Sequence, residues 1–409
     1  MKVLYITNAL THYYNLVLSR LNQEKGIDLV TISPLGNNSS QVGSGVKLTK
    51  DGINFTTIEL EERNYLLYYT FHKLASKIST EKPDVIIVTP SYLLTFLLDF
   101  RLRKVIKNNN IGILVRFHSF GALSYQDTIK NIVNTSKHFS FLPSIVNSAL
   151  NLFGVDKIIL YIRLRIQKMA YNLPDAYACY AESNDVLSSY GVNKEKIFIT
   201  RNSPDTDSLF HAKEKILALP NQFLENKHRI IHVGRLVAWK KVDMLIRSFS
   251  NVCYNFPNSE LIIIGAGPEM GVLKELIKVL KLEGSVKFLG GVYEQTNLAQ
   301  YLNESSLYVL AGMGGLSIND AMCFGLPILC SECDGTEKFL VRDGVNGRYF
   351  ITGDEEDLTN KIIWFFDNPK KTFNMGAASI NIIKDEINIH TVIKEHIRAI
   401  NYIRNKKNN

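Results

Sequence analysis

The stretch RIIHVGRLVAWKKVDMLIRSF, residues Arg229–Phe249, has the pattern that decides the fold of this chain. Its opening residues form a mostly apolar run up to Val233, which is typical of a parallel strand covered on both faces. Gly234 ends the run, and apolar residues at helical spacing begin at Val242. The stretch therefore predicts a strand, a loop and a helix.

The same unit recurs on both sides of this stretch along the 409 residues. The predicted strands cover residues 3–6, 27–33, 84–90, 112–121, 176–183, 196–202, 229–235, 260–268, 285–291, 307–312, 327–331 and 347–350. Two runs of β/α alternation predict an α/β protein with two doubly wound, Rossmann-like parallel sheets that face each other across a cleft. The pattern breaks near residues 203–228. We therefore expect a first domain over residues 1–205, a second over 206–378, and a helical tail, 379–409, that crosses back onto the first.

Composition places the chain among ordinary globular proteins, with 46% hydrophobic and 21% charged residues. Five scattered cysteines and no secretory signal at the start predict a reduced, cytoplasmic protein. Cys330 and Cys333 form a lone C-x-x-C without a second pair or histidines nearby. A zinc site is therefore disfavoured.

The formal net charge is +8, and most of the excess lies in residues 1–205. Such asymmetry predicts that the first domain faces an anionic partner, which is anionic lipid, nucleic acid or an acidic substrate. Phe139–Val155 is too short and too polar to span a bilayer. Lys157–Ala170 and Asp99–Lys107 mix apolar and basic residues. They are either segments that lie on an anionic membrane, at its inner face, or ordinary helices with a solvated basic side.

Ligands of doubly wound sheets bind at the carboxyl ends of the strands, so residues at those ends are candidates for a site. Gly234, Arg235 and Lys240 follow a predicted strand, and their two cations are suited to hold a phosphate. His118 ends a strand of the first domain and would face the cleft. Its alternative role is that of a satisfied core histidine.

Gly265 and Gly267 follow an apolar strand and precede a helix, which partly matches a dinucleotide-binding fingerprint. Met270 occupies the third glycine position, and the next strand ends in glycines rather than an acid. A nicotinamide dehydrogenase is therefore disfavoured. A turn that admits a ligand to the backbone is the preferred interpretation.

In GGLSINDAMCFGLP, Ser317 and Asp320 match a capping box that starts a helix. The amide end of such a helix, behind Gly314, Gly315 and Leu316, also attracts anions. The two roles are compatible, and together they predict a diphosphate site.

Asp205 and Asp207 form an Asp-x-Asp pair in the predicted interdomain turn. A pair of this kind either binds a divalent metal or caps a helix and its turn. Because its place in the chain is a turn, the capping role is favoured.

With these motifs in order, Arg229–Phe350 resembles the GT-B glycosyltransferases, in their retaining group with an E-x7-E pair (glycosyl transferases group 1). VGRLVAWKKVDMLI is similar to that family's G-R-L-x-x-x-K-G-x-D stretch, and GGLSINDAMCFGLPILCSECDGTEKFLVRDGVNGRYF is similar to its donor-binding signature. LIIIGAGPEMGVLKEL fits between them. The first half resembles the family more weakly, in MKVLYITN and KIFITRNSPDTDSLF.

The resemblance implies transfer of a sugar, with retention, from a nucleotide-diphosphate donor to a glycan or lipid-linked acceptor, as in bacterial surface polysaccharide synthesis. Arg235 and Lys240 would neutralise the leaving diphosphate, and the turn at residues 314–317 would add backbone donors. His118 would contact the donor sugar near the reaction centre. The leaving phosphate would accept the acceptor's proton, with no metal, no cofactor and no nucleic-acid partner.

For the rest of the donor, the resemblance implies that Asp320 binds the ribose hydroxyls and that Gly291 and Val292 lie beside the base. Three departures accompany it. Gly312 stands where the first acid of the pair, which usually holds hydroxyls of the donor sugar, is expected. Lys241 replaces a glycine, and a glycine-rich loop is not evident near Asn8 and Ala9.

Two other functions remain open at this point. One is a nucleotide-sugar epimerase of the same fold, which would need further acid and base residues in the cleft. The other is a nucleotide-sugar binding protein without activity, which Gly312 would explain.

Overall fold

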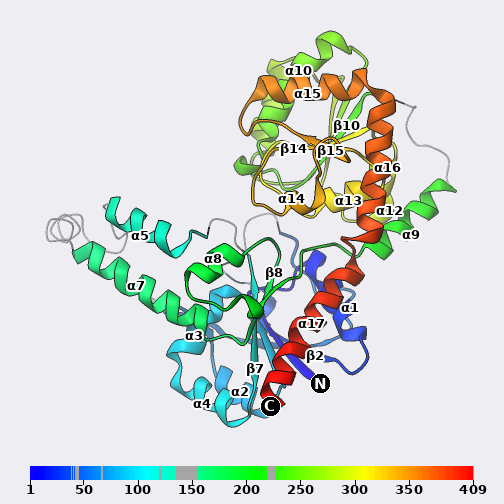
Figure 1. Ribbon diagram of the computed structural model, residues 1–409. Coiled ribbons are helices and arrows are strands. Elements are labelled where there is room, and N and C mark those ends of the chain that lie inside the picture. Colours follow the sequence, from blue (N-terminus) through cyan, green and yellow to red (C-terminus); the bar gives the residue numbers. More distant parts are fainter. Residues whose placement is uncertain are drawn as a thin grey trace.

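The computed structural model describes residues 1–37, 39, 41, 46–65, 68–118, 122–134, 155–218 and 226–408. Two parallel β-sheets, each covered by helices, form two domains (Figure 1). Their strand orders are β3-β2-β1-β6-β7-β8-β9 and β12-β11-β10-β13-β14-β15. In both sheets the order reverses beside the first strand of the unit, as in Rossmann-like folds. The predicted architecture is confirmed.

The first domain contains the seven-stranded sheet and a short antiparallel hairpin, β4–β5. Its strands are β1 Lys2–Ile6, β2 Asp28–Pro34, β3 Thr56–Leu60, β4 Glu62–Asn64, β5 Tyr69–Phe71, β6 Val85–Val88, β7 Gly112–Phe117, β8 Ala176–Cys179 and β9 Ile197–Ile199. Its helices are α1 His12–Gln23, α2 Leu74–Glu81, α3 Leu93–Leu98, α4 Phe100–Asn108, α5 Tyr125–Asn134, α7 Val155–Asn172 and α8 Asn184–Ser189.

The second domain contains the six-stranded sheet. Its strands are β10 Arg229–Val233, β11 Glu260–Ile264, β12 Val286–Gly290, β13 Leu307–Leu310, β14 Ile328–Cys330 and β15 Gly347–Tyr349. The helices around it are α9 Thr206–Leu217, α10 Val242–Asn255, α11 Met270–Val279, α12 Gln295–Asn303, α13 Ser317–Cys323, α14 Glu337–Leu340, α15 Glu355–Asp367 and α16 Pro369–Asp385.

Each strand is apolar because both faces of its sheet are covered. In β10, for example, Ile230 and Ile231 are both fully buried, but they belong to core clusters on opposite faces of the sheet. Burying a side chain of this size contributes about 1.5–3 kcal/mol. The continuous apolar runs therefore fix the strands centrally between helices, and the polar loops at their ends remain available for a site.

The last helix, α17 Ile389–Asn408, crosses from the second domain to the first, as predicted. Ile400 and Ile403 are fully buried in the same core cluster as Val3 and Leu114 of the first sheet. The predicted limit at residue 379 falls inside α16, and Ile382 and Ile383 of that helix pack in the second domain.

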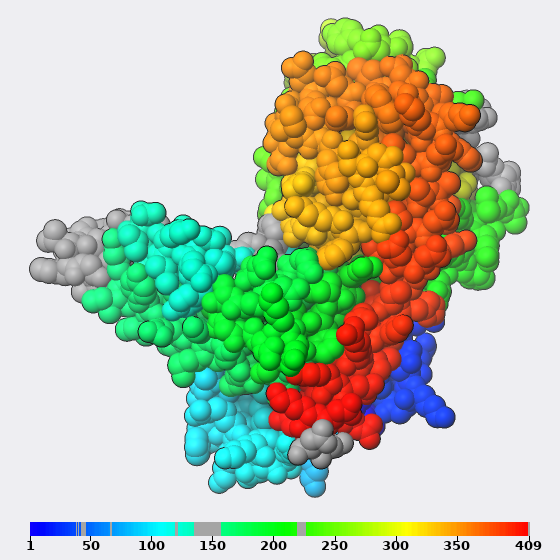
Figure 2. Space-filling view, in the orientation of Figure 1, coloured from blue at the N-terminus to red at the C-terminus, as the bar shows by residue number. Residues whose placement is uncertain are grey.

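An arm made of α5 and α7 projects from the first domain (Figure 1). The space-filling view shows the surface hollowed between this arm and the second domain (Figure 2). The stretch Phe139–Val155, apart from its last residue, lies outside the described residues. Among the helices that the structure describes, none combines the length and the apolar character needed to cross a bilayer.

Candidate active site between the two domains

The loop after β10 brings Arg235 and Lys240 to the carboxyl edge of the second sheet. The amide of Gly234 donates to the carbonyl of Ile264 at 2.9 Å, which ties this loop to the end of β11. A single 3-10 turn, Ala238–Lys240, then leads into α10. Lys241 has a φ of 53°, a left-handed conformation that favours glycine. This conformation explains why a glycine was expected at this position.

Lys240 is buried, with only 6% of the residue exposed. Its Nζ donates to the carbonyl of Met313 at 2.7 Å and also to that of Gly314. Burial, followed by repulsion from Arg235, lowers the pKa of Lys240 to about 8. The ammonium group therefore lies directly against the glycine turn. Both were predicted to bind the same diphosphate.

Arg235 lies half-buried beside Lys240, and its guanidinium carbon is 5.7 Å from the ring centroid of Trp239. Its effect on the pKa of Lys240 shows that the two cations are close enough to interact. Two neighbouring cations at a strand end are electrostatically unfavourable until an anion binds between them.

The capping-box prediction for α13 is wrong. The helix begins at Ser317, Leu316 is its N-cap, and no side chain caps it. The hydroxyl of Ser317 instead shares a hydrogen bond of 2.7 Å with the hydroxyl of Tyr308, which has to be satisfied because Tyr308 is fully buried. The turn before the helix nevertheless lies against Lys240, because the carbonyl of Gly314 accepts from its Nζ and a Cβ on Gly315 would lie 3.2 Å from that nitrogen.

Asp320 is half-buried on α13, and its carboxylate makes no hydrogen bond within the described part of the chain. Burial raises the pKa of Asp320 to about 7. A carboxylate without partners in a poorly hydrated place is unfavourable, and hydroxyl groups of a ligand would relieve it.

His118 follows β7 and lies across from the glycine turn. It lines a cavity of about 140 Å³ whose opposite wall includes Gly315, Leu316, Asn319 and Asp334. Burial lowers the pKa of His118, an effect that the Asp334 carboxylate partly offsets. The structure thus brings His118 and the turn to one interdomain cavity.

Gly265 and Gly267 have a packing role that the sequence did not indicate. A Cβ on Gly265 would lie 1.8 Å from the carbonyl oxygen of Gly234, and one on Gly267 would lie 2.2 Å from that of Leu236. Both glycines therefore let two strand-end loops pack backbone to backbone. Their predicted contact with the donor stays a prediction.

Gly291 and Val292 follow β12, the edge strand of the second sheet. The next residue, Tyr293, reaches the first domain, where its ring centroid is 5.7 Å from that of His12 and 4.9 Å from Nζ of Lys47. The loop predicted to lie beside the base therefore also joins the two domains.

Gly312, which replaces the expected first acid, has no room for a side chain. A Cβ there would lie 2.3 Å from the carbonyl oxygen of Trp239 and 2.6 Å from the carbonyl carbon of Lys240. The amide of Met313 donates to the same Trp239 oxygen at 3.0 Å. The turn that carries Lys240 thus occupies the space that an acid at residue 312 would need.

Sequence reasoning missed three charged residues of the cavity, Arg116, Arg201 and Asp334. Arg116 donates to the hydroxyl of Tyr5 at 2.6 Å and stacks 3.4 Å from the ring centroid of Tyr14, and its buried Nε has no partner among the described residues. A single arginine inside an otherwise apolar strand was the available signal. Asp334 follows β14, the same kind of position that drew attention to His118.

Asp205 and Asp207 act structurally. Asp205 caps α9 by accepting from the amide of Ser208, and Arg20 reaches both carboxylates, at 3.1 Å and 3.2 Å. His390 of α17 lies 3.0 Å from Asp207. These contacts fasten the junction between the domains.

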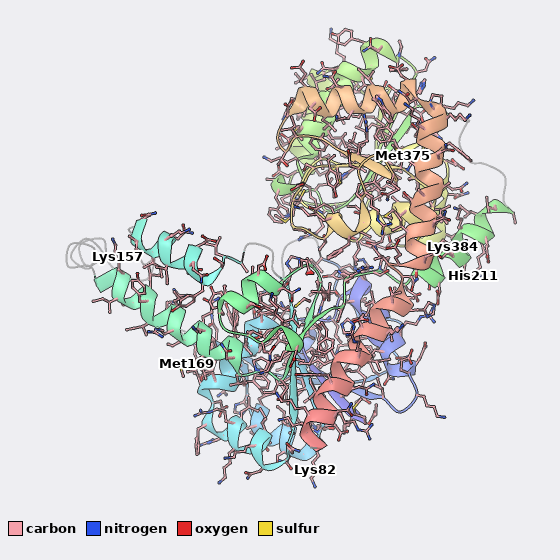
Figure 3. All side chains as sticks on the ribbon, viewed as in Figure 1. Lys82, Lys157, Met169, His211, Met375 and Lys384 are labelled. Atoms are coloured by element: carbon pink, nitrogen blue, oxygen red, sulfur yellow. The ribbon has the colours of Figure 1, made fainter. Side chains whose placement is uncertain are left out.

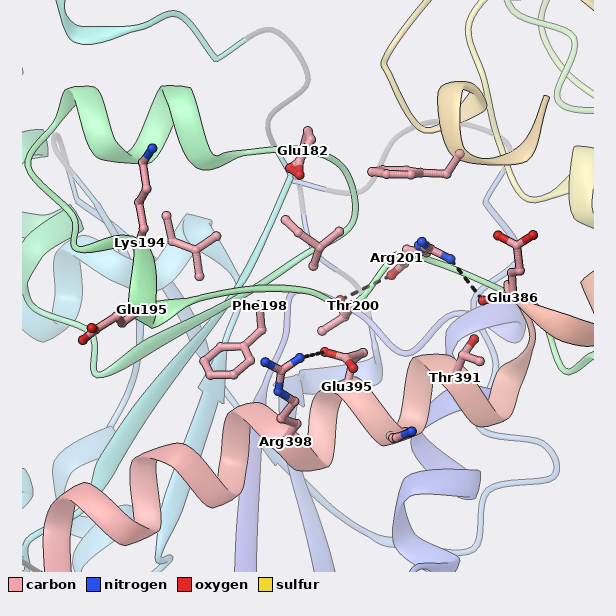
Figure 4. Close-up of a pocket in the computed structure, with 14 residues that line it drawn as sticks. Glu182, Lys194, Glu195, Phe198, Thr200, Arg201, Glu386, Thr391, Glu395 and Arg398 are labelled. Atoms are coloured by element: carbon pink, nitrogen blue, oxygen red, sulfur yellow. Dashed lines mark hydrogen bonds and ion pairs between the residues drawn. The ribbon is translucent and has the colours of Figure 1, made fainter. Parts of the chain in front are cut away.

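A larger cavity, of about 600 Å³, lies beside β9 and α17 (Figure 4). It shares Arg201 and Phe339 with the interdomain cavity but contains none of the predicted site residues. Several of its charges are already engaged, since Arg398 pairs with Glu395 and Arg201 donates to the carbonyl of Glu386. The smaller cavity is therefore the better candidate for the reaction site.

Residues 190–381 match the family model of glycosyl transferases group 1. An uncharacterised glycosyltransferase of Haemophilus influenzae is 31% identical over 176 residues, 42% of this chain and 48% of that protein. One from Methanocaldococcus jannaschii is 27% identical over 318 residues, 70% of this chain and 75% of that protein. The alignment thus spans about half of the Haemophilus relative.

The O-antigen biosynthesis glycosyltransferase WbnH of Escherichia coli is 24% identical over 280 residues, 67% of this chain and 72% of that protein. Among solved structures, Anabaena HepE in complex with UDP has a TM-score of 0.68 at 17% identity, covering 98% of this chain and 100% of that one. The lipopolysaccharide outer core galactosyltransferase WaaB has a TM-score of 0.62 at 14% identity, covering 98% and 99%. At these identities the structural likeness concerns the fold.

Proposed function

The chain belongs to the glycosyl transferases group 1 family, and on that premise we propose that it transfers a sugar from a nucleotide-diphosphate donor to a glycan or lipid-linked acceptor, with retention at the anomeric carbon. The observation that carries the proposal is the position of Lys240. Its buried ammonium group lies against the glycine turn, and that turn faces His118 across the interdomain cavity.

The donor's diphosphate would lie at Arg235 and Lys240. The buried ammonium group now donates to two carbonyls, and phosphate oxygens are stronger acceptors for it. Charge that develops on the leaving diphosphate would be stabilised by cations already in place. The amides of residues 314–317 would add hydrogen bonds.

The nucleoside would extend along the second domain. The Asp320 carboxylate, without a hydrogen bond in the described structure, would accept from the ribose hydroxyls. Gly291 and Val292 would lie beside the base, near Tyr293. The loop of Gly265 and Gly267 would complete this wall.

The reaction would take place between the diphosphate and His118. The bond from the anomeric carbon to the phosphate oxygen breaks, the acceptor oxygen forms its bond on the same face, and the phosphate oxygen takes the acceptor's proton. Because the pKa of His118 is lowered, its ring is neutral at pH 7 and suited to a hydrogen bond with the sugar.

A lipid-linked acceptor in cell-envelope polysaccharide synthesis fits the first domain. Similar proteins bear names from O-antigen and lipopolysaccharide synthesis. Ile158, Ile162 and Met169 of α7 are 57%, 54% and 60% exposed, and Arg165 lies on the same side of the helix. Figure 3 shows Lys157 at the outer end of the arm and Met169 nearer its base. Exposed apolar and basic side chains together favour contact with anionic lipid.

One observation favours a second function. Gly312 removes an acid that the family uses on the donor sugar, so the chain would bind nucleotide sugars without turning them over. Incubation with UDP-glucose, UDP-N-acetylglucosamine and GDP-mannose separates the two. Hydrolysis or transfer supports the enzyme, and binding without turnover supports the binding protein.

The diphosphate site is tested with Arg235→Ala and Lys240→Ala. Since each removes a charged hydrogen-bond donor, we expect a loss of affinity for UDP or GDP of about tenfold or more, measured by calorimetry. Lys274→Ala, which changes an exposed lysine of α11, is the control. Unchanged affinity in both site variants would refute the assignment.

A further inference from the structure

The interdomain cavity contains one carboxylate among its described lining residues, that of Asp334. Its two oxygens lie 3.0 Å and 3.1 Å from the position that a Cβ on Gly314 would occupy. The same carboxylate acts electrostatically on Lys240 and on His118. Asp334 therefore lies beside the glycine turn, at the cavity that His118 also lines.

The loop that carries Asp334 is fastened to the backbone of Gly312. The thiol of Cys333 donates to the carbonyl of Gly312 at 2.9 Å. The buried carboxylate of Glu337 also accepts from two amides of this loop, that of Cys333 at 3.1 Å and that of Gly335 at 3.0 Å. This arrangement holds Asp334 beside the residue that was expected to be an acid.

The side chain of Asp334 is held in one orientation by Thr336, and this leaves one carboxylate oxygen for a ligand. Its Oδ1 accepts from both the amide and the hydroxyl of Thr336. No hydrogen bond to Oδ2 is found within the described ranges. A fixed carboxylate with an unused oxygen is an acceptor prepared for a ligand's hydroxyl groups.

We propose that Asp334 supplies the carboxylate that binds hydroxyl groups of the donor sugar, in place of the acid that Gly312 cannot carry. The inference rests on the proposed function, because only a nucleotide-sugar donor would place a sugar between Lys240 and His118. It also explains how the chain could be active with Gly312, since a carboxylate from a neighbouring loop would take the role of the missing acid.

The test compares each donor with its own nucleotide diphosphate: UDP-glucose and UDP-N-acetylglucosamine with UDP, and GDP-mannose with GDP. Calorimetry gives the Kd of both for wild type, Asp334→Ala and Asp334→Asn. Glu332→Ala is the matched control, because this acid of the same loop is exposed and pairs with Lys338. The nucleotide Kd reports that the variant is folded.

For the donor that wild type binds best, we expect the ratio of donor Kd to nucleotide Kd to rise about tenfold or more in both Asp334 variants. The nucleotide Kd stays within about twofold, and Glu332→Ala keeps the wild-type ratio. If the ratio is unchanged in the Asp334 variants while wild type binds donors, the inference is wrong and the proposed function stands. If wild type binds none of these nucleotides, the proposed function fails and the inference fails with it.

Discussion

Lys240 is buried and Asp320 is half-buried, and the loss of water around each side chain shifts their pKa values in opposite directions. The pKa of the Lys240 ammonium falls to about 8, and the pKa of the Asp320 carboxyl rises to about 7. In both, burial disfavours the charged form. A diphosphate beside Lys240 and hydroxyl groups beside Asp320 would restore the interactions that water no longer supplies.

The raised pKa of Asp320 predicts a pH-dependent stability. Between about pH 4 and pH 7 the folded protein keeps a proton that the unfolded chain releases, so the free energy of unfolding falls as pH rises through this window. Asp320→Asn should be more stable than wild type by about 2 kcal/mol at pH 8 and equally stable at pH 4, as measured by urea unfolding.

The value of about 2 kcal/mol is roughly half of what the full pKa shift would give, because the residue is only half-buried. A difference that is the same at both pH values would contradict the prediction. It would mean that the carboxylate is well hydrated in the folded protein.

At the scale of single elements, α7 is a long helix of which few apolar residues are buried. Its buried residues Leu164 and Ala170 hold it to the first domain, while much of its length is exposed on the arm. The exposed apolar residues recur at helical spacing, which suits a flat apolar surface better than water.

The double variant Ile158→Ser, Ile162→Ser should bind more weakly to vesicles of phosphatidylglycerol and phosphatidylcholine, by about tenfold or more, because two aliphatic side chains no longer enter the interface. Co-sedimentation measures the binding. The control is Val272→Ser, Val279→Ser, which changes two exposed aliphatic residues of α11 on the second domain. Equal binding by wild type and the α7 variant would exclude this surface.

Some helices and strands could be predicted from the sequence alone, and others could not. The strand at Arg229–Val233 and the helix from Val242 follow from apolar spacing, which is a local property. The start of α13 does not follow from local spacing. The hydroxyl of Ser317, which a capping box would use, instead makes a hydrogen bond with Tyr308, nine residues earlier. Local propensity was overridden by a buried group from a neighbouring strand.

The candidate site divides in the same way. Lys240, His118 and the glycine turn could be named in advance because each follows a predicted strand. The position of Asp334 could not be predicted. It depends on the hydrogen bond from Cys333 to the carbonyl of Gly312 and on the hydrogen bond from the amide of Cys333 to Glu337. Contacts across the fold of this kind leave no periodic trace in the sequence.

At the scale of the whole molecule, α17 makes the first domain depend on the last residues of the chain. Ile403 is fully buried against Gly112, where a Cβ would lie 2.1 Å from its side chain. The first core is therefore completed only after the second domain has been traversed. The two domains are joined by the chain twice, before α9 and after α16.

Ile403→Ala should lower the free energy of unfolding of the first domain by about 2–5 kcal/mol, because it leaves a cavity in a packed core. Affinity for UDP or GDP, which depends on the second domain, should not change. Thermal unfolding and calorimetry check the two parts, with exposed Arg404→Ala as the control. A parallel loss of nucleotide affinity would mean that the domains fold as one unit.

Tyr293 links the second domain to His12 and Lys47 on the other side of the cleft. The interdomain cavity beside His118, about 140 Å³, is smaller than the roughly 300–1,000 Å³ that small-molecule sites usually provide. A donor sugar and its acceptor therefore need more room beside His118 than this cavity offers, and the contact of Tyr293 with His12 is one that we expect to break if the two domains separate to admit them.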